Sequence, residues 1–350
     1  MQLNVVSVDM YSNKKSRCKT IMLLITYKCN LICTYCYEPK ISHNSINETN
    51  AKKYIEDIVS SLSNEYDEFE VQFMGGEPLM EFSLIKEVSE WLWTQYFPIS
   101  LKHIFAPTNG TLLTEEMKSW FTEHKNKICL GLSFDGNRLM QNINRSKSYN
   151  SVDLHFFSSI WPKQSVKMTI SPHTLQNLYE GVIFLYSKGF RYITVDLAMG
   201  KHILWKQKHL KVLSEQLSQL SSYYLHHSDM PLISMLNINI EDVLQKHSSF
   251  KKCGCGEDLV CVDCDGSTYG CHLFAPISAS KELAEKSLSI DFSNHDSFVS
   301  ETCHKCLLYP VCTICYGMNY LNTGDIKIQH PFICQAFKIQ FLSSCKLQLQ

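Results

Sequence analysis

The sequence lacks an excess of charge of either sign, because 33 lysine and arginine residues nearly balance 34 aspartate and glutamate residues. This balance argues against a chain that binds nucleic acid or a membrane surface through bulk electrostatic attraction. The sequence also lacks an apolar run near the roughly 18 residues that a membrane-spanning helix needs. Its first residues contain no basic region followed by a long apolar stretch, so we expect no signal peptide and a cytoplasmic location.

Without an export signal, disulfide bonds are a poor explanation for the sixteen cysteines of the chain. Their distribution is uneven: three lie within residues 29–36, eleven lie between residues 253 and 345, and only Cys18 and Cys129 fall elsewhere. A disulfide scaffold would spread its cysteines more evenly. We therefore expect the two groups to serve metal binding or catalysis.

The first two hundred residues predict an α/β fold. The chain has 350 residues, 45% of them apolar, which suffices for one large fold with an appendage. Short apolar runs largely alternate with amphipathic helical stretches such as residues 48–62. The six strand-like runs are residues 21–27, 69–74, 103–107, 128–134, 166–170 and 192–197. This alternation predicts a parallel sheet of βα units, curled into a partial (β/α)6 TIM-like barrel.

Polar motifs follow the first four strand-like runs. They are the cysteine segment 29–36, Gly-Gly-Glu-Pro at 75–78, Thr-Asn-Gly at 108–110 and Ser-Phe-Asp-Gly at 133–136. Each motif taken alone is compatible with an ordinary turn. Because barrels of this kind place their chemistry at the carboxyl ends of the strands, the shared position predicts one common site.

The most informative motif consists of Cys29, Cys33 and Cys36. Three thiolates cannot complete a tetrahedral zinc site. A [4Fe–4S] cluster takes thiolate ligands on its irons, so three cysteines leave one iron open to chelate a small molecule. A chance grouping in a cysteine-rich chain is the alternative. The spacing resembles the signature of the radical S-adenosylmethionine (SAM) family, whose open iron binds the amino and carboxylate groups of SAM. In that family the reduced cluster splits SAM to a 5′-deoxyadenosyl radical.

The same resemblance implies which other residues contact SAM. Residues 75–78 are similar to the family motif whose backbone carbonyls accept hydrogen bonds from the SAM amino group, and glycine permits a close approach there. Ser133 and Arg145 fall where related enzymes contact the ribose and carboxylate, although a surface arginine is an equal alternative. Tyr35 lies where the family packs an aromatic residue near adenine, and a core tyrosine is the alternative. The implied cofactor-binding residues are Tyr35, Gly75, Gly76, Glu77, Asn109, Ser133 and Arg145.

Residues 253–334 carry Cys253, a Gly-x4-Cys segment that ends at Cys271, the pairs Cys303-x2-Cys306 and Cys312-x2-Cys315, and a last Cys334. Their order and spacing resemble the SPASM extension of radical SAM enzymes that act on peptides and proteins, in which the Gly-x4-Cys segment forms a hairpin. The gap before Cys315 is two residues where the family pattern has three, which leaves the ligation of Cys315 open. The resemblance implies an outer auxiliary [4Fe–4S] cluster held by Cys303, Cys306, Cys312 and Cys334. It implies an inner cluster held by Cys253, Cys271 and Cys315, with Cys255, slightly favoured, or Cys261 as the fourth ligand.

Other interpretations of the tail stay open. The Cys-x-x-Cys pairs are compatible with structural zinc, and the inner cluster could keep an open iron that contacts substrate. Cys18, Cys129, Cys264 and Cys345 are surplus to these sets, and we expect them to be packing residues. The predicted division is a radical SAM barrel over residues 1–200, a helical connector over 201–250 and a SPASM domain over 251–350.

The resemblance implies three [4Fe–4S] clusters, SAM and an external electron donor of the flavodoxin or ferredoxin type. The predicted function is a maturase that abstracts hydrogen from a side chain of a ribosomally made precursor peptide. The product would be an intramolecular carbon–carbon, ether or thioether cross-link. We identify no general base in the sequence. Because only 28 residues precede Cys29, we expect leader recognition to use a separate protein or the tail, or to be dispensable.

Two other functions compete with the cross-linking maturase. An anaerobic sulfatase-maturating enzyme would oxidise a cysteine or serine to formylglycine. In that subfamily an Asp near the cysteine of the Gly-x4-Cys hairpin is thought to accept a proton. Cys271 is the hairpin cysteine here, and His272 follows it. From another class, a non-catalytic iron–sulfur electron carrier would have no use for an open iron.

Overall fold

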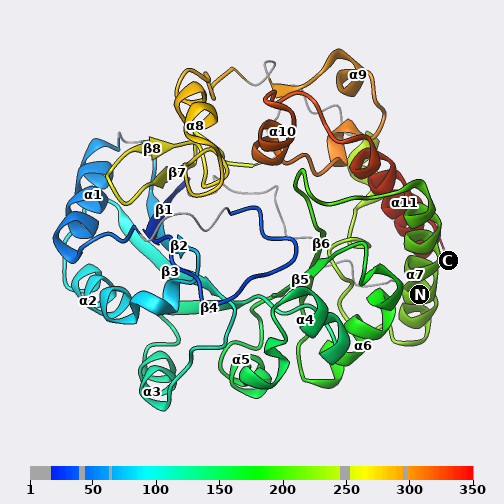
Figure 1. The fold of residues 1–350 in the computed structure, drawn as a ribbon, viewed down its shortest axis with the longest axis horizontal. Coiled ribbons are helices and arrows are strands. Elements are labelled where there is room, and N and C mark those ends of the chain that lie inside the picture. The colour runs from blue at the N-terminus through cyan, green and yellow to red at the C-terminus, as the bar shows by residue number, and fades with distance from the viewer. Residues whose placement is uncertain (1–16, 39–43, 63–64, 245–252, 295–297, 350) are drawn as a thin grey trace.

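The computed structural model describes residues 17–38, 44–62, 65–244, 253–294 and 298–349. Figure 1 shows the strands arranged in an arc around the middle of the molecule, with helices α1–α6 on the outer side of that arc. The C-terminal residues lie across the open side of the arc, opposite α3 and α5. Within the described residues, no helix is both long and apolar enough to cross a membrane.

The strands follow the predicted runs closely. All six predicted strands are present, and two more come from the tail. The described strands are β1 (Cys18–Thr26), β2 (Glu68–Gly75), β3 (Ser100–Thr108), β4 (Ile128–Leu132), β5 (Val166–Ile170), β6 (Ile193–Leu197), β7 (Leu259–Val262) and β8 (Thr268–Tyr269).

The sheet is parallel from β1 to β4. Ile21, Val71, Ile104 and Ile128 form one buried row across the four strands, each paired with the next. Strands β5 and β6 form a separate parallel pair, which a single bridge between Ser133 and Lys167 joins to the end of β4. The predicted α/β class with a parallel sheet is confirmed, but the described strands form two sheets instead of one continuous array.

The helices begin at residues that satisfy free backbone N–H groups. The side chains of Asn47, Thr114, Asn137 and Asp153 accept hydrogen bonds at the starts of α1, α3, α4 and α5. The α-helices are α1 (Glu48–Ser61), α2 (Phe82–Leu92), α3 (Glu115–Glu123), α4 (Arg138–Asn144), α5 (Leu154–Ile160), α6 (Leu178–Ser187), α7 (Gln207–His226), α8 (Lys281–Ser287), α9 (Glu301–His304), α10 (Tyr316–Thr323) and α11 (Pro331–Gln348). Short 3-10 helices are η1 (Pro78–Glu81), η2 (Ser148–Ser151), η3 (Leu175–Asn177), η4 (Ile240–Leu244) and η6 (Tyr309–Val311).

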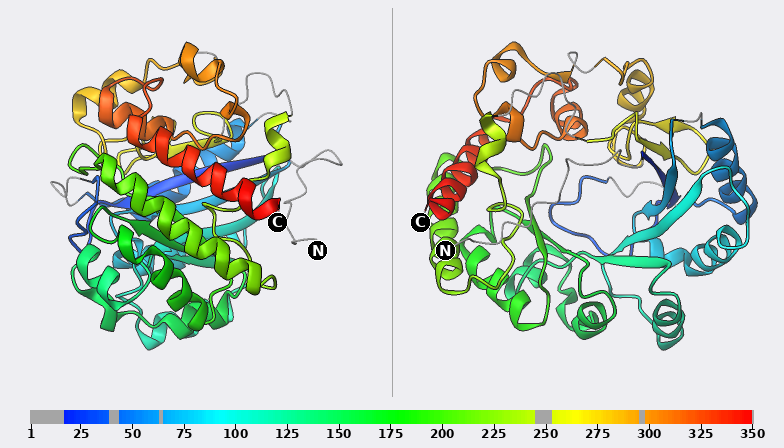
Figure 2. Two further views of the ribbon diagram at one scale, coloured as in Figure 1. Left: turned by 90° about the vertical axis from the view of Figure 1, so that its right-hand side faces the viewer. Right: turned by 180° about the vertical axis from the view of Figure 1, so that it is seen from behind.

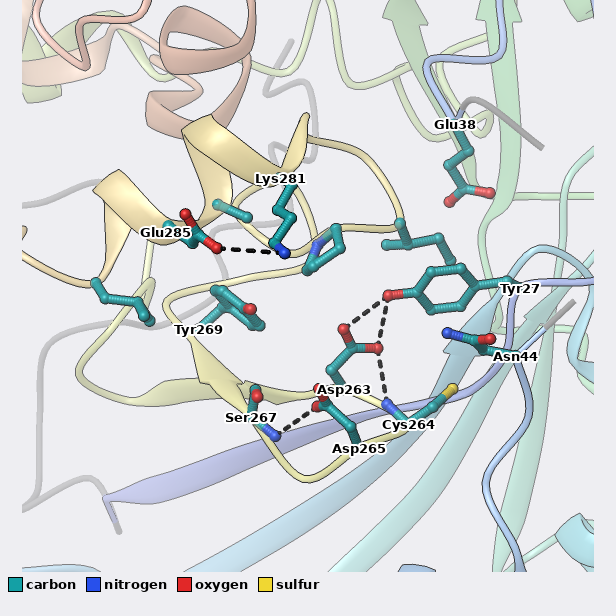
Figure 3. Close-up of a pocket in the computed structure, with 14 residues that line it drawn as sticks. Tyr27, Glu38, Asn44, Asp263, Cys264, Asp265, Ser267, Tyr269, Lys281 and Glu285 are labelled. Carbon is teal, nitrogen blue, oxygen red and sulfur yellow. Dashed lines mark hydrogen bonds and ion pairs between the residues drawn. The ribbon is translucent and has the colours of Figure 1, made fainter. Parts of the chain in front are cut away.

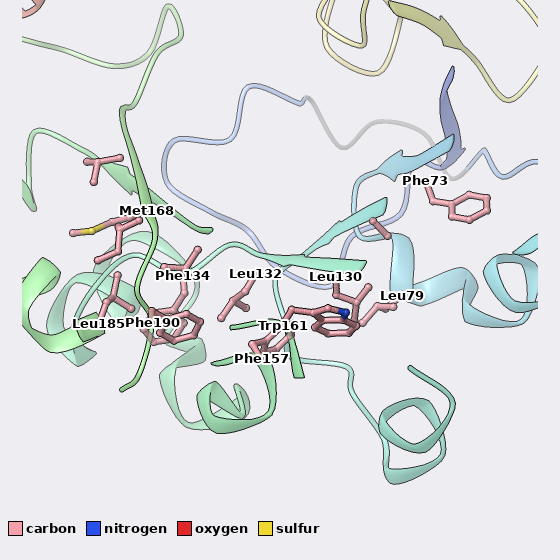
Figure 4. Packing of buried hydrophobic residues seen from close by; sticks show 14 of the residues in the cluster. Phe73, Leu79, Leu130, Leu132, Phe134, Phe157, Trp161, Met168, Leu185 and Phe190 are labelled. Atoms are coloured by element: carbon pink, nitrogen blue, oxygen red, sulfur yellow. The ribbon is translucent and has the colours of Figure 1, made fainter. Parts of the chain in front are cut away.

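Strand β1 is buried on both faces, as expected of a central parallel strand. Its residues Ile21, Leu23 and Ile25 belong to the main core, which continues through the aromatic and aliphatic side chains of Figure 4. Met22 and Leu24 point to the opposite face and pack in a smaller cluster with residues of the tail. The strand that leads into the cysteine loop is therefore held by apolar contacts from both sides.

The tail is joined to the N-terminal sheet and also has a core of its own. Strand β7 pairs in parallel with β1, so residues far apart in sequence share one sheet. A separate cluster includes Phe274, Phe298, Tyr316 and Tyr320. Helix α7 and the C-terminal helix α11 pack side by side along one flank (Figure 2). The predicted boundary between residues 250 and 251 lies outside the described residues, and the division into three parts stays a prediction.

Candidate functional site

The cysteine loop is docked against the C-terminal end of α4. The backbone of Cys33 forms an antiparallel bridge with Arg145, and the amide of Thr34 donates to the carbonyl of Asn144 at 2.8 Å. The amide of Ile32 donates to Oγ of Ser146 at 2.8 Å. Ser146 has a φ of 53°, in the left-handed region that costs a non-glycine residue free energy. The strained turn thus forms part of the support for the loop.

A buried carboxylate holds this arrangement together. The side chain of Asp135 is fully buried and accepts hydrogen bonds from the Tyr35 hydroxyl at 2.7 Å and from Nε of Arg145 at 3.1 Å. It also accepts from Nδ2 of Asn144 at 3.0 Å and from the amide of Thr169 at 3.0 Å. Burial acts to lower the pKa of Arg145, but the charges of Asp135, Tyr35 and Cys33 together with the hydrogen bond to Asp135 outweigh it, so the pKa is raised. Arg145 is therefore a positioned cation.

Tyr35 lies directly beside that cation. Its ring is 5.4 Å from the guanidinium carbon of Arg145, and burial raises the pKa of its hydroxyl. Asp135, the residue that holds both side chains, was not among the predicted site residues. The signal was present, because Asp135 belongs to the polar motif 133–136 at the end of the fourth strand.

Two glycines, the last residue of β2 and the residue after it, bring the end of this strand against the base of the cysteine loop. Gly75 has a φ of +147°, and a Cβ there would lie 2.0 Å from the carbonyl oxygen of Thr26. A Cβ on Gly76 would lie 2.3 Å from the carbonyl oxygen of Lys28. Real side chains do not tolerate such contacts with backbone. The motif therefore needs glycine for packing against the loop.

Glu77 ties the ends of β2 and β3 together. Its carboxylate accepts hydrogen bonds from the hydroxyl of Thr108 at 2.7 Å, the amide of Asn109 at 2.7 Å and the amide of Leu79 at 3.1 Å. Burial raises the pKa of Glu77, although these bonds act in the opposite direction. The Asn109 side chain donates in turn to Asn30 of the cysteine loop at 2.9 Å. Both side chains thus have partners within the protein.

One cavity of about 660 Å³ brings the predicted SAM site together. Cys29, Cys33 and Cys36 line it. So do all seven residues predicted to bind SAM: Tyr35, Gly75, Gly76, Glu77, Asn109, Ser133 and Arg145. From the tail, Cys312, Cys315 and His272 reach the same cavity. This convergence fits an iron–sulfur cluster with a bound nucleoside. The cavity is lined by thiols that could bind iron, by a buried cation that could bind a carboxylate and by glycine backbone that a ligand could approach.

The tail cysteines fall into two electrostatic groups. In the first, the Cys255 thiol is hydrogen-bonded to Cys253 and Cys271, which raises its pKa. Burial raises the pKa of Cys315 to about 12, and Cys271 and Cys253 add to that shift. These four are the predicted inner set with Cys255 as its fourth member.

The second group surrounds Cys312. Burial raises the pKa of this thiol to about 12, with further contributions from Cys334, Cys303 and Cys306. These are the four cysteines of the predicted outer set. Across the described residues, no three His, Cys, Asp or Glu side chains are grouped to hold one metal ion. The ligands of a [4Fe–4S] cluster bind different irons and need not meet at one point.

The alternative inner ligand Cys261 has a different environment. It lies on β7, fully buried, and packs with Met22, Leu24, Ala275 and Ile277. Burial raises its pKa well above the usual value, and the nearby charge of Cys271 adds to the shift. Among the surplus cysteines, burial raises the pKa of Cys18 to about 11 and those of Cys129 and Cys264 to about 12. It also raises the pKa of Cys345. Cys129 and Cys264 are half-buried and pack against the main core, in line with the expected packing role, which stays a prediction for Cys18 and Cys345.

A half-buried pair of side chains connects the cysteine loop with the tail. The Tyr37 hydroxyl, one residue after Cys36, is hydrogen-bonded to Nε2 of His272 at 2.9 Å. His272 follows Cys271 and is half-buried, and its buried Nδ1 atom has no hydrogen-bond partner among the described residues. Burial lowers the pKa of His272 to about 4, with Lys167 adding to the shift, so the ring is neutral near pH 7. Sequence reasoning noted His272 but missed Tyr37.

A second cavity of about 500 Å³ lies between β7, β8, α8 and the residues that follow β1 (Figure 3). The Tyr27 hydroxyl donates to both carboxylate oxygens of Asp263 at 2.7 Å. Burial raises the pKa values of both groups. Glu38 lines this cavity and the larger one. The Tyr27–Asp263 contact therefore links the residue after β1 to the residue after β7, at the turn between the antiparallel strands β7 and β8.

Comparison of the sequence with known proteins identifies radical SAM relatives. A family model described as a 4Fe-4S single cluster domain matches residues 17–150. The chain is 24% identical over 348 residues to a cysteine-type anaerobic sulfatase-maturating enzyme of Clostridium perfringens, with 89% of this chain and 91% of that enzyme covered. It is 21% identical over 362 residues to the radical SAM cyclopropyl synthase TigE of Paramaledivibacter caminithermalis, covering 92% of this chain and 72% of the synthase. An uncharacterised protein of Methanocaldococcus jannaschii is 27% identical over 201 residues, which are 56% of this chain and 66% of that protein.

Solved structures share the fold. Native anSMEcpe with bound AdoMet and Cp18Cys peptide matches with a TM-score of 0.73 at 19% identity, covering 95% of this chain and 98% of that one. Streptococcus suis SuiB bound to the precursor peptide SuiA matches with a TM-score of 0.62 at 15% identity, covering 91% and 76%. The chain is thus homologous to anaerobic sulfatase-maturating enzymes and to a radical SAM cyclopropyl synthase. The predicted resemblance to radical SAM enzymes with a SPASM extension is confirmed.

Proposed function

We propose that this chain is a radical SAM maturase that cross-links side chains of a ribosomally made peptide. The observation that carries the proposal is the single cavity lined by the three loop cysteines, the predicted SAM contacts and residues of the tail. A reduced [4Fe–4S] cluster on Cys29, Cys33 and Cys36 would supply the 5′-deoxyadenosyl radical from SAM. The protein supplies binding and orientation around it.

In this proposal each neighbouring residue has a defined task. Arg145, held by Asp135, binds the carboxylate of SAM, since a guanidinium pairs well with a carboxylate. Gly75 and Gly76 let the backbone after β2 approach the amino group of SAM. Glu77 and Asn109 hold the ends of β2 and β3 in position. Ser133 and Tyr35 complete the nucleoside side of the site.

The tail would hold two auxiliary clusters, which brings the total to three. We propose Cys303, Cys306, Cys312 and Cys334 for the outer cluster. For the inner cluster we propose Cys253, Cys255, Cys271 and Cys315, because Cys255 contacts both Cys253 and Cys271. The barrel-like arc of β1–β6, the connector and the tail would then be the three parts of the enzyme, with the peptide between arc and tail.

The cross-linking reaction is favoured by two features. His272 stands beside the hairpin cysteine where the formylglycine-forming subfamily has an acidic residue. The relatives also include a cyclopropyl synthase, and SuiB has been solved with a precursor peptide. Both proteins are similar in fold or sequence over most of this chain.

Formylglycine formation is the second candidate, and one observation favours it. The match to the Clostridium perfringens enzyme covers 91% of that protein, more than the 72% of the cyclopropyl synthase. A non-catalytic electron carrier is the remaining alternative. SAM cleavage by the reduced protein would exclude it.

Mass spectrometry separates the two reactions. The anaerobically reconstituted protein is incubated with SAM, dithionite and either a short peptide found to be encoded beside its gene or a cysteine-containing sulfatase peptide. We expect the encoded peptide to lose two hydrogens per cross-link and the sulfatase peptide to stay unchanged. Loss of sulfur from the sulfatase peptide would establish formylglycine formation instead. An encoded peptide of unchanged mass during active SAM cleavage contradicts the proposal. A Cys29→Ala variant is the matched control.

A further inference from the structure

The cysteine loop has an outward side that the cavity does not use. Ile32 lies between the proposed ligands Cys29 and Cys33, and 81% of its surface is exposed. Cys29 and Cys33 line the large cavity, whereas Ile32 is not among its lining residues. The loop therefore presents its thiols to the cavity and an apolar side chain to solvent.

Two more exposed apolar residues lie on α4, against whose C-terminal end the cysteine loop is docked. The hydrogen bond from the Ile32 amide to Ser146 places this residue at the C-terminal end of α4. On α4, Leu139 is 53% exposed and Ile143 is 36% exposed, four positions apart on one face of the helix. We call Ile32, Leu139 and Ile143 the outer patch. Large exposed apolar side chains that gather in one place often mark an interaction surface.

The segments that carry the outer patch bear only positive charge. Residues 28–36 contain one lysine and no acidic residue. Residues 136–148 also contain no acidic residue, and of their three basic residues Arg145 is buried and paired with Asp135. Arg138 and Lys147 are exposed. Since the whole chain has a formal net charge of −1, this is a local basic rim around an apolar centre.

We propose that the outer patch, with Arg138 and Lys147, is the docking surface for an acidic one-electron carrier of the flavodoxin or ferredoxin type. The inference rests on the proposed function, because only a reducible cluster needs such a partner. The carrier gives up one electron and the cluster on the loop accepts it, with no covalent bond made or broken in either protein. Electron transfer slows steeply with distance, and Ile32 lies between two proposed cluster ligands and directly adjoins Cys33. A partner on this side also leaves the peptide cavity accessible.

The test compares a protein donor with a small one that needs no docking. In the double variant Ile143→Glu/Lys147→Glu, we expect flavodoxin-driven SAM cleavage to fall about tenfold, because the reversed charge repels an acidic partner. Cleavage driven by dithionite should stay at the wild-type rate. The affinity for flavodoxin, measured by calorimetry on the reconstituted protein, should weaken by a similar factor.

Helix α11 offers a matched control, because Leu342 and Lys346 are also exposed and also four positions apart. The variant Leu342→Glu/Lys346→Glu carries the same charge change and should behave as wild type. Leu139→Glu, which removes an apolar contact without touching the end of α4, should weaken flavodoxin binding as well. Unchanged flavodoxin affinity in the α4 variants, or an equal loss in the α11 control, overturns the assignment. If the wild-type protein fails to cleave SAM even with dithionite, the proposed function fails, while the affinity measurement still tests the docking surface.

Discussion

The loop cysteines and the tail cysteines reach their positions in different ways. The three loop cysteines lie within eight residues, and their loop is fastened by hydrogen bonds to α4 and by the buried network around Asp135. The proposed tail ligands extend from Cys253 to Cys334 and are gathered by a core that includes Phe274 and Tyr320. The comparison indicates that hydrogen bonds position the loop cysteines, whereas packing of segments far apart in sequence positions the tail cysteines.

The largest effect should come from removing a ligand from each region. We expect Cys29→Ala to reduce SAM cleavage to background, because no other described thiol of the loop can replace the lost ligand. We expect Cys334→Ala to keep dithionite-driven SAM cleavage while abolishing peptide modification. Chromatography of 5′-deoxyadenosine measures SAM cleavage, mass spectrometry measures peptide modification, and iron analysis measures the cluster content of both variants. If Cys334→Ala loses SAM cleavage as completely as Cys29→Ala, the two regions are not functionally separate.

A smaller effect should follow from breaking the buried network of the loop. Asp135→Asn leaves Arg145 buried without its counter-charge, which should lower the free energy of unfolding by about 3–5 kcal/mol. Tyr320→Phe is the counterpart in the tail and removes one hydrogen bond, to the carbonyl of Leu283. It should cost only about 1 kcal/mol. Urea denaturation under anaerobic conditions measures both values, and equal losses would contradict the proposed difference.

The smallest effect concerns the glycines of the two regions. Gly76→Ala forces a Cβ against the carbonyl of Lys28, and the required shift should cost about 1–3 kcal/mol and weaken SAM binding. Gly324→Ala in the tail meets nothing within 4 Å and carries only the penalty of its φ of +77°, about 1–2 kcal/mol. The affinity for SAM, measured by calorimetry, distinguishes the two variants. We expect a loss in Gly76→Ala alone, and unchanged affinity in that variant would remove Gly76 from the proposed site.

The secondary structure was largely predictable because local periodicity encodes it. The run 166–170 coincides with β5, and the other five predicted strands differ from β1–β4 and β6 by a few residues at their ends. The cavity was predictable in composition, since parallel strands deliver their following loops to one side of the sheet. The pairing of β7 with β1 was not, because nothing in the short run 259–262 specifies a partner more than 230 residues away.

By itself, the sequence determined the type of chemistry: three closely spaced thiols, glycines at the next strand end and a second set of cysteines in the tail. Those features depend only on residue type and on spacing along the chain, so they can be recognised without knowledge of the fold. Only the tertiary structure decided that Asp135 joins Tyr35 to Arg145, that Tyr37 meets His272 and that Cys255 contacts Cys253 and Cys271. These contacts join segments up to 235 residues apart, and only packing of the whole chain brings such segments within hydrogen-bond distance.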